Sequence, residues 1–332
     1  MDNSHRKSNH VLMNTSAPFV FIHSGDSWYL PYALQQARQA DSQAAIFLLG
    51  DTQSVGSGIL KRNLKEYETD VARRFRKLYY QNSPNPLENE LVCYLRWFHL
   101  ANFFKQEMLR DAFYFDSDVL VYSSGNEVKR TLLDQGVECG LSVHSQSHES
   151  CLWTACGHAS YWQANILEEF CEFCLQSYES NDYLARYHRK VEWHKREGVL
   201  GGITDMTALY FFWERNQHRI ANLAIRKNGT VVDHNVANSA NQGDDEYLME
   251  GGIKKIRFQA GKPYIFTAPS AEPMLAHSLH FQGGCKQLMP TYYTGPAFRQ
   301  QWLVDKPTDT KLIRSCKKRA LAIKSFLVGP GP

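Results

Sequence analysis

Asp111-Ala-Phe-Tyr-Phe-Asp-Ser-Asp-Val-Leu-Val-Tyr122 is the stretch of sequence that decides the fold. Its apolar run up to Phe115 predicts a buried strand, and the residues from Val119 onward predict a second extended piece. Asp116 and Asp118 stand between them, and side chains two apart on extended backbone project to the same side. Two carboxylates at a strand end are costly to hold together unless a cation binds them, and oxygen ligands suit Mg²⁺ or Mn²⁺.

A strand, a turn, a helix and a second strand precede this stretch. Phe19-Val-Phe-Ile-His23 and Ala45-Ile-Phe-Leu-Leu49 are short apolar runs that predict buried strands. This order is typical of a nucleotide-binding α/β fold, in which ligands bind beyond the carboxyl ends of the strands. The turn after the first run holds Gly25, Asp26 and Tyr29. Asp26 could accept a hydrogen bond from a nucleobase and Tyr29 could stack on it; the alternative is a turn leading into a helix, with an aromatic ring in the core.

Two later segments have clear local patterns. Apolar residues between Leu60 and Leu78 keep helical spacing among many charges, which predicts one amphipathic surface helix. Asn228-Gly229 lies between two short apolar runs and predicts a hairpin turn. Gly140-Leu-Ser-Val143 predicts a further strand.

Two charged residues have unusual surroundings. Arg96 lies among apolar residues in a helix predicted from about Glu90 to Glu107. A guanidinium there requires a carboxylate or a phosphate, so a structural ion pair and a substrate contact are both open. Asp205 follows two glycines at the start of a predicted helix. It is either a helix N-cap or a carboxylate presented to a substrate.

His280-Phe-Gln-Gly-Gly-Cys-Lys286 is the last candidate segment. Apolar neighbours place His280 in a short strand. Gly283 allows the backbone to approach a ligand closely, and Lys286 could place its charge on a phosphate. Because a neutral imidazole ligates Mn²⁺ better than Mg²⁺, His280 favours manganese. The alternative is a structural histidine.

These segments, taken in order, resemble the motifs of GT-A glycosyltransferases, most closely family eight, in a poorly characterised bacterial-type branch. That family has an Asp-x-x-Tyr turn, a helix with a basic residue, a strand followed by Asp-x-Asp, and a final His-x-x-Gly-x-x-Lys. The matching residues here are Asp26–Tyr29, Arg96, Asp116–Asp118 and His280–Gly283–Lys286. The resemblance spans roughly Phe19 to Tyr293.

The resemblance implies a set of site residues. The metal ligands are expected to be Asp116, Asp118 and His280, holding Mn²⁺, with Mg²⁺ as the alternative. The catalytic residues are expected to be Asp205 and Lys286. The donor-binding residues are expected to be His23, Gly25, Asp26, Tyr29, Arg96, Asp116, Ser117, Gly157, Gly283 and Lys286.

The implied activity is transfer of a hexose from a nucleotide sugar, a UDP-sugar being favoured, with retention of anomeric configuration. The implied acceptor is a hydroxyl group of a glycan, a lipid-linked molecule or another compound. Gln287-Leu288 stands where the family usually has Pro-Trp, and Met206 stands where it usually has Gln. These departures concern the acceptor side more than the metal site.

The expected fold class is α/β, a GT-A (Rossmann-like) mixed sheet flanked by helices. Residues 1–16 are expected to be a flexible N-terminus, residues 17–298 the glycosyltransferase domain, and residues 299–332 a basic amphipathic tail. The tail fits either peripheral contact with an anionic membrane surface or a solvated helix packed by its apolar stripe.

Composition excludes some classes of protein. The chain has 332 residues and a net charge of +3, too small to favour nucleic acid as a partner. No secretory signal or transmembrane run is visible, so we expect a cytoplasmic protein, or one peripheral at the inner face of a membrane. The eight cysteines are therefore expected to be reduced thiols, and Cys171 and Cys174 to pack in a core rather than bind zinc.

Three other functions remain open. A phosphatase of the haloacid dehalogenase type also has a strand followed by Asp-x-Asp, but usually continues with Gly-Thr, where Val119-Leu120 follows here. A nucleotidyltransferase would need basic residues in its first phosphate loop, which Ser24–Ser27 lacks. A nucleotide-sugar-binding domain without activity is the third.

Overall fold

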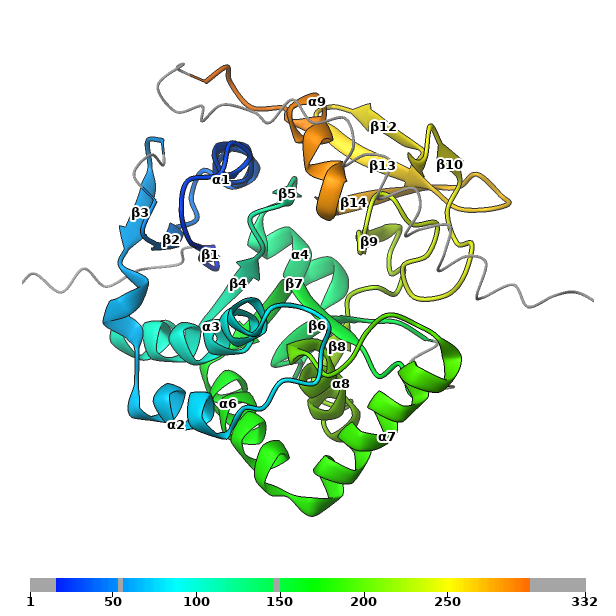
Figure 1. The fold of residues 1–332 in the computed structure, drawn as a ribbon. Coiled ribbons are helices and arrows are strands. Elements are labelled where there is room, and N and C mark those ends of the chain that lie inside the picture. Colours follow the sequence, from blue (N-terminus) through cyan, green and yellow to red (C-terminus); the bar gives the residue numbers. More distant parts are fainter. Residues whose placement is uncertain (1–15, 53–55, 146–149, 299–332) are drawn as a thin grey trace, which may run out of the picture.

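The computed structural model describes residues 16–52, 56–145 and 150–298 (Figure 1). They form a mixed central β-sheet flanked by helices, which confirms the α/β class expected from the sequence. The predicted tail, residues 299–332, lies outside the described residues, as do residues 1–15. Within the described part, no helix has the length and apolar character that a bilayer crossing requires.

The larger sheet has seven strands in the order β3-β2-β1-β4-β7-β6-β8. Strands β1, β2, β3 and β4 are parallel, whereas β7 runs antiparallel to both β4 and β6. The strands are β1 (Phe19–His23), β2 (Ile46–Gly50), β3 (Ile59–Arg62), β4 (Asp111–Phe115), β6 (Cys139–Val143), β7 (Ala155–Gln163) and β8 (Ile220–Asn222). The parallel start of this sheet is the strand order predicted from the first two apolar runs.

Each face of this sheet carries its own hydrophobic core, because alternate residues of a strand point to opposite faces. Val20 and Tyr114 pack into one core, and Phe19 and Phe115 pack into the other. The helices of the first core are α2 (Asp70–Leu78), α3 (Leu87–Gln106), α6 (Ala164–Glu179), α7 (Asn181–Glu197) and α8 (Asp205–Arg215). Those of the second core are α1 (Leu30–Ala40), α4 (Gly125–Leu132) and α9 (Met289–Tyr292).

A smaller sheet completes the second core and lies beside α9 in Figure 1. Its strands are β12 (Ile256–Gln259), β13 (Lys262–Phe266), β14 (Pro273–His280) and β5 (Val119–Val121), with β9 (Thr230–Val232) parallel to β14. A short separate hairpin pairs β10 (Met249–Glu250) with β11 (Ile253–Lys254). The chain therefore leaves the larger sheet at the end of β4 and enters the smaller one at β5, so Asp116–Asp118 is the crossing between the two sheets.

Two local predictions differ from the structure. The single helix expected between Leu60 and Leu78 is wrong: β3 comes first, then a 3₁₀ turn at Leu64–Tyr67, and only then α2. The turn at Asn228-Gly229 does form, with positive φ at both residues. Lys227 and Thr230 pair antiparallel across it, as in a hairpin. However, the pairing stops at this single bridge, because the predicted strand before the turn does not form and β9 pairs with β14 instead.

A buried ion pair links the separate hairpin to the end of β14, which carries His280. Lys254 Nζ lies 2.5 Å from Asp233 Oδ1, and both side chains are fully buried. The other oxygen of Asp233 accepts a 3.0 Å hydrogen bond from the backbone N–H of His280. The seven described cysteines are free thiols, and Cys171 and Cys174 are buried in the first core as expected.

Lys254→Met should lower the free energy of unfolding by about 3–5 kcal/mol, because it leaves the Asp233 carboxylate buried without its cation. Urea unfolding measures this loss. Lys195→Met, at a side chain 68% exposed, is the matched control and should change stability by no more than about 0.5 kcal/mol. Equal unfolding midpoints for the two variants would contradict the role given to the buried pair.

Candidate functional site

The crossing between the sheets brings Asp118 against the end of β14. His280 is paired in register with Val119, so its ring lies next to Asp118, with Nε2 3.5 Å from Oδ1. Lys286 Nζ lies 2.5 Å from Oδ2 of the same carboxylate. Burial opposes the charges of this cluster, but the ion pairs outweigh it. The pKa of Asp118 is held well below its ordinary value by His280 and Lys286, and the pKa of Lys286 is raised by Asp118.

The ring of His280 is oriented by the backbone. Its Nδ1 lies 2.6 Å from the carbonyl oxygen of His234, so Nδ1 carries the proton and donates. Burial lowers the pKa of His280, but Asp118 outweighs burial and raises it, so without a cation Nε2 carries a proton toward the carboxylate. In a neutral ring, Nε2 would offer its lone pair to a cation in place of that proton. Metal-binding histidines are held in this way by a carbonyl or carboxylate behind the ring. Asp118 and His280 therefore fit a divalent cation that accepts oxygen and imidazole ligands.

Arg96 occupies the centre of a second cluster. It donates from Nη1 to Asp116 Oδ1 at 2.8 Å and from Nη2 to Asp205 Oδ2 at 2.7 Å. Tyr114 also donates to Asp116 Oδ1, at 2.6 Å, and Trp97 donates to Asp205 Oδ2, at 3.0 Å. Of the two alternatives left open for Arg96, the structural ion pair is thus present, and the guanidinium joins the carboxylates of Asp116 and Asp205 directly.

Asp205 is almost completely buried, with its side chain 4% exposed. It occupies the first position of α8, and the N-cap is Thr204. Its expected catalytic role stays a prediction, since the structure shows its carboxylate accepting hydrogen bonds from Arg96 and Trp97.

The loops after β1 and β2 form the third part of the site. His23 contacts the hydroxyl groups of Ser117 and Ser27 through its two ring nitrogens, at 2.9 and 3.0 Å. Gly25, with φ of 76°, donates its N–H to Asp51 Oδ1 at 2.7 Å. This hydrogen bond contributes most to the lowered pKa of the Asp51 carboxyl.

The predicted base-binding residues lie next to these loops. Asp26 is exposed and accepts a hydrogen bond from the Thr52 hydroxyl. The ammonium of Lys286 lies 5.5 Å from the centre of the Tyr29 ring, which links this part of the site to Asp118.

The two predicted glycines differ in their surroundings. Gly283 has a positive φ of 60° at the start of the 3₁₀ turn Gly283–Leu288, which carries Lys286. A Cβ at Gly157 would lie 2.5 Å from an indole carbon of Trp97, so close packing against that ring explains this glycine. Its expected contact with a donor sugar stays a prediction.

The three predicted metal ligands are only partly brought together. Asp118 and His280 are adjacent, whereas the described side-chain hydrogen bonds of Asp116 are all accepted by Oδ1, from Arg96 and Tyr114. Across residues 16–52, 56–145 and 150–298, the one trio of acidic, Cys or His ligand atoms within 4.8 Å of each other is Cys156, His158 and His234. Membership of Asp116 in a metal site therefore stays a prediction.

Sequence reasoning missed several residues that shape the site. Asp51 follows β2, and its position at the carboxyl end of a strand parallel to β1 is a signal that could have found it. Tyr114, His158 and His234 gave no local signal, because only the pairing of distant strands brings them to the motif residues. The ring of His158 stacks on that of His280 with centroids 4.3 Å apart.

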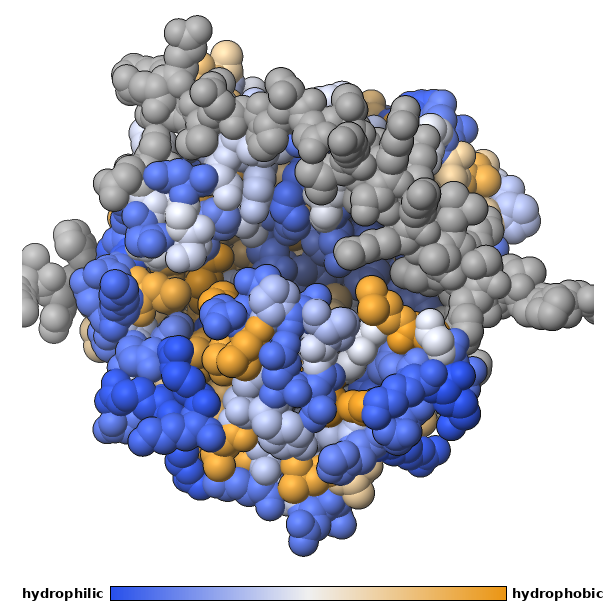
Figure 2. Space-filling model, in the orientation of Figure 1, coloured by the Kyte–Doolittle hydropathy of each residue, from blue (hydrophilic) through white to orange (hydrophobic). Residues whose placement is uncertain are grey.

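The face shown in Figure 2 is hollowed near its centre, among mainly hydrophilic residues, where Figure 1 has the facing ends of β4 and β5. A separate surface cavity of about 510 Å³ lies between residues 81–84 and 191–201. None of the predicted site residues lines that cavity.

The chain was compared with known proteins. No model of a known protein family matches it, and no curated protein matches its sequence. Among solved structures, the galactosyltransferase LgtC in complex with donor and acceptor sugar analogs is 14% identical, with 86% of this chain and 98% of that chain covered and a TM-score of 0.40. Mouse xyloside xylosyltransferase 1 is 6% identical, with 61% and 83% covered and a TM-score of 0.39. The glycosyltransferase GlyE of Streptococcus pneumoniae is 12% identical, with 62% and 45% covered and a TM-score of 0.34. At these identities and TM-scores the similarity assigns no activity to the chain.

Arg96→Met should lower the free energy of unfolding by about 3–5 kcal/mol, because it leaves the buried Asp205 carboxylate without its cation. Adding Asp205→Asn should recover part of the loss, since a neutral amide costs less to bury than a charge. Urea unfolding of the single and double variants measures both steps. If the double variant is no more stable than Arg96→Met, the loss comes from packing rather than from charge.

Proposed function

We propose that this protein is a metal-dependent glycosyltransferase with a GT-A type fold, which transfers a hexose from a UDP-sugar to a hydroxyl acceptor. The observation that carries the proposal is the cluster of Asp118, His280 and Lys286 at the crossing between the two sheets. A carboxylate, an oriented imidazole and an ammonium group meet there, beside an aromatic ring at the carboxyl end of β1. These are the groups that a nucleoside diphosphate with its cation requires.

The metal would be held by Asp118 and His280, with Asp116 as a further candidate ligand. Mn²⁺ is favoured over Mg²⁺ because of the imidazole. When bound, such an ion stabilises negative charge on the departing diphosphate. The ammonium of Lys286, now paired with Asp118, would bind a phosphate oxygen once the cation takes over that carboxylate.

The nucleoside would lie over the loops after β1 and β2. Tyr29 offers a ring face for the base, and the exposed carboxylate of Asp26 can accept from the N–H of uracil. His23 and Ser117, which contact each other, tie this region to the acidic motif. Gly25 is fixed by Asp51 and so presents its loop to the ligand in one conformation.

Arg96 would act as a positioning residue for the two carboxylates that it contacts, and would not itself exchange a proton. It fixes the carboxylates of Asp116 and Asp205 relative to one another, at 2.8 and 2.7 Å. We assign Asp205 to orienting the acceptor or to stabilising the sugar carbon as it acquires positive charge, with retention of configuration. The acceptor is a glycan or a lipid-linked molecule, and contact with a membrane would involve residues 299–332.

The phosphatase alternative is less well supported by the site. Its nucleophile would be Asp116, whose Oδ1 is held by Arg96 and Tyr114. A domain that binds a nucleotide sugar without catalysing would use the same cluster of Asp118, His280 and Lys286, and turnover distinguishes it from the transferase. Covalent trapping of an aspartyl phosphate would favour the phosphatase.

Asp118→Asn should abolish Mn²⁺-dependent turnover, because it removes the carboxylate shared by the cation and Lys286. The measurement is release of UDP from a panel of UDP-sugars, with Mn²⁺, Mg²⁺ or EDTA. We expect release to require metal and to fall at least about a hundredfold in the variant. Asp26→Asn is the comparison within the donor site and should retain metal dependence with a raised KM. Full activity of Asp118→Asn, with the fold intact, would refute the metal assignment.

Tyr29→Ala should weaken UDP binding by about 1–3 kcal/mol, roughly 5- to 150-fold in Kd, because base stacking is lost. Tyr29→Phe keeps the ring and should bind UDP nearly as well as the unchanged protein. Calorimetric titration with UDP in the presence of Mn²⁺ measures both. Equal losses in the two variants would point to the hydroxyl group instead of the ring face.

A further inference from the structure

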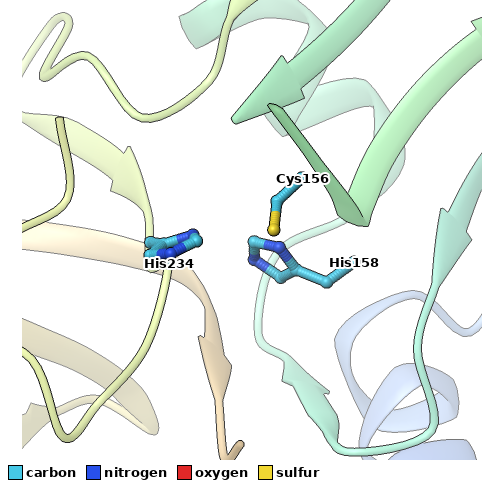
Figure 3. A group of neighbouring side chains, drawn as sticks. All are labelled: Cys156, His158 and His234. Atoms are coloured by element: carbon cyan, nitrogen blue, oxygen red, sulfur yellow. The ribbon is translucent and has the colours of Figure 1, made fainter. Parts of the chain in front are cut away.

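Three side chains beside the proposed donor site converge on one point (Figure 3). Cys156 and His158 lie two apart on β7 and so point to the same side of the strand. His234 faces them from the segment after β9, across a gap between the two chain segments. One ligand atom of each lies within 4.8 Å of the other two. The proposed donor chemistry does not use this trio.

The imidazoles of the trio have ring nitrogens available as ligands. His158 Nε2 lies 3.1 Å from the carbonyl oxygen of Asp233 and donates its proton there, which leaves a lone pair on Nδ1. That Nδ1 atom is buried and has no hydrogen-bond partner among the described residues. The Nδ1 atom of His234 is likewise buried and unpartnered within the described part of the chain. Buried nitrogens without partners are costly, and a cation would satisfy both.

The third member makes the trio selective for a thiophilic cation. Two imidazoles and one thiolate are ligands that suit Zn²⁺, which takes three protein ligands and an open fourth position in many sites. The Sγ atom of Cys156 also lies 3.4 Å from the thioether sulfur of Met206, so a second polarisable sulfur lies next to the thiol. As whole residues, Cys156 and His234 are partly exposed, whereas His158 is buried.

We propose that Cys156, His158 and His234 form a zinc site, separate from the site of Asp118 and His280. Binding would replace the S–H proton of Cys156 by the metal, with release of that proton to solvent and no change of oxidation state. Zinc would also fix the ring of His158, which stacks on His280 and is held from behind by Asp233. The site therefore supports the donor site without sharing a ligand with it.

The test uses the full chain, freed of metal with a chelator and then titrated with Zn²⁺ and with Co²⁺. We expect one equivalent of Zn²⁺ to bind and to raise the melting temperature, because a ligand of the native state stabilises it. Cobalt should give the absorption of a thiolate-to-metal charge transfer. Cys156→Ser and His234→Gln should each weaken zinc binding at least about tenfold, and Cys156→Ser should abolish the cobalt absorption.

Two control variants distinguish this zinc site from other thiols and from the proposed Mn²⁺ site. Cys93→Ser removes a partly exposed thiol outside the trio and should leave zinc binding unchanged. Asp118→Asn should lose the proposed Mn²⁺ site but keep zinc, so failure of one assignment is distinguishable from failure of the other. Circular dichroism verifies that each variant is folded. The proposal is overturned if the unchanged protein binds no zinc, or if folded Cys156→Ser and His234→Gln variants bind it as tightly.

Discussion

The passage of the chain from one sheet to the other at Asp116–Asp118 is the constraint on which the rest of the site depends. The N–H of Asp116 is bonded to the His158 carbonyl in β7, and the carbonyl of Asp118 accepts from the N–H of Phe281 after β14. The three-residue crossing is thus held by both sheets at once. Its two carboxylates point to different partners, one toward Arg96 and the other toward His280 and Lys286. A site placed between two packed layers moves little, which is what positioning a diphosphate requires.

Ion pairs on either side of the crossing hold its neighbouring residues in place. Asp233 binds Lys254 with one oxygen and the backbone of His280 with the other, so the cation stabilises the strand end that bears the histidine. On the opposite side, Arg96 makes the same kind of link between Asp116 and Asp205. Removing one member of such a pair leaves an unpaired charge in the interior, which costs more than the pair contributes. The ion pairs therefore fix geometry rather than add stability.

The parts of the fold that follow from local pattern were predictable. The apolar runs of β1, β2 and β4 and the strand ending at His280 form where expected, because short apolar runs rich in aromatic and β-branched residues and bounded by turn residues are typical of buried strands. The segment from Leu60 to Leu78 was not predictable: the edge strand β3 is short and half exposed, so its pattern resembles a helix face. The pairing of β7 with β4 is likewise invisible in the sequence. It brings Cys156 and His158 to the site, and no local pattern marks them.

The most direct test of the central claim is a crystal structure of the protein with Mn²⁺ and UDP. We expect an anomalous manganese peak bonded to Asp118 Oδ and His280 Nε2, with the diphosphate on the same ion and Lys286 turned from Asp118 to a phosphate oxygen. We also expect the uracil against Tyr29. UDP bound elsewhere, or Lys286 still paired with Asp118 at saturating Mn²⁺ and UDP with no ion at His280, would contradict the account.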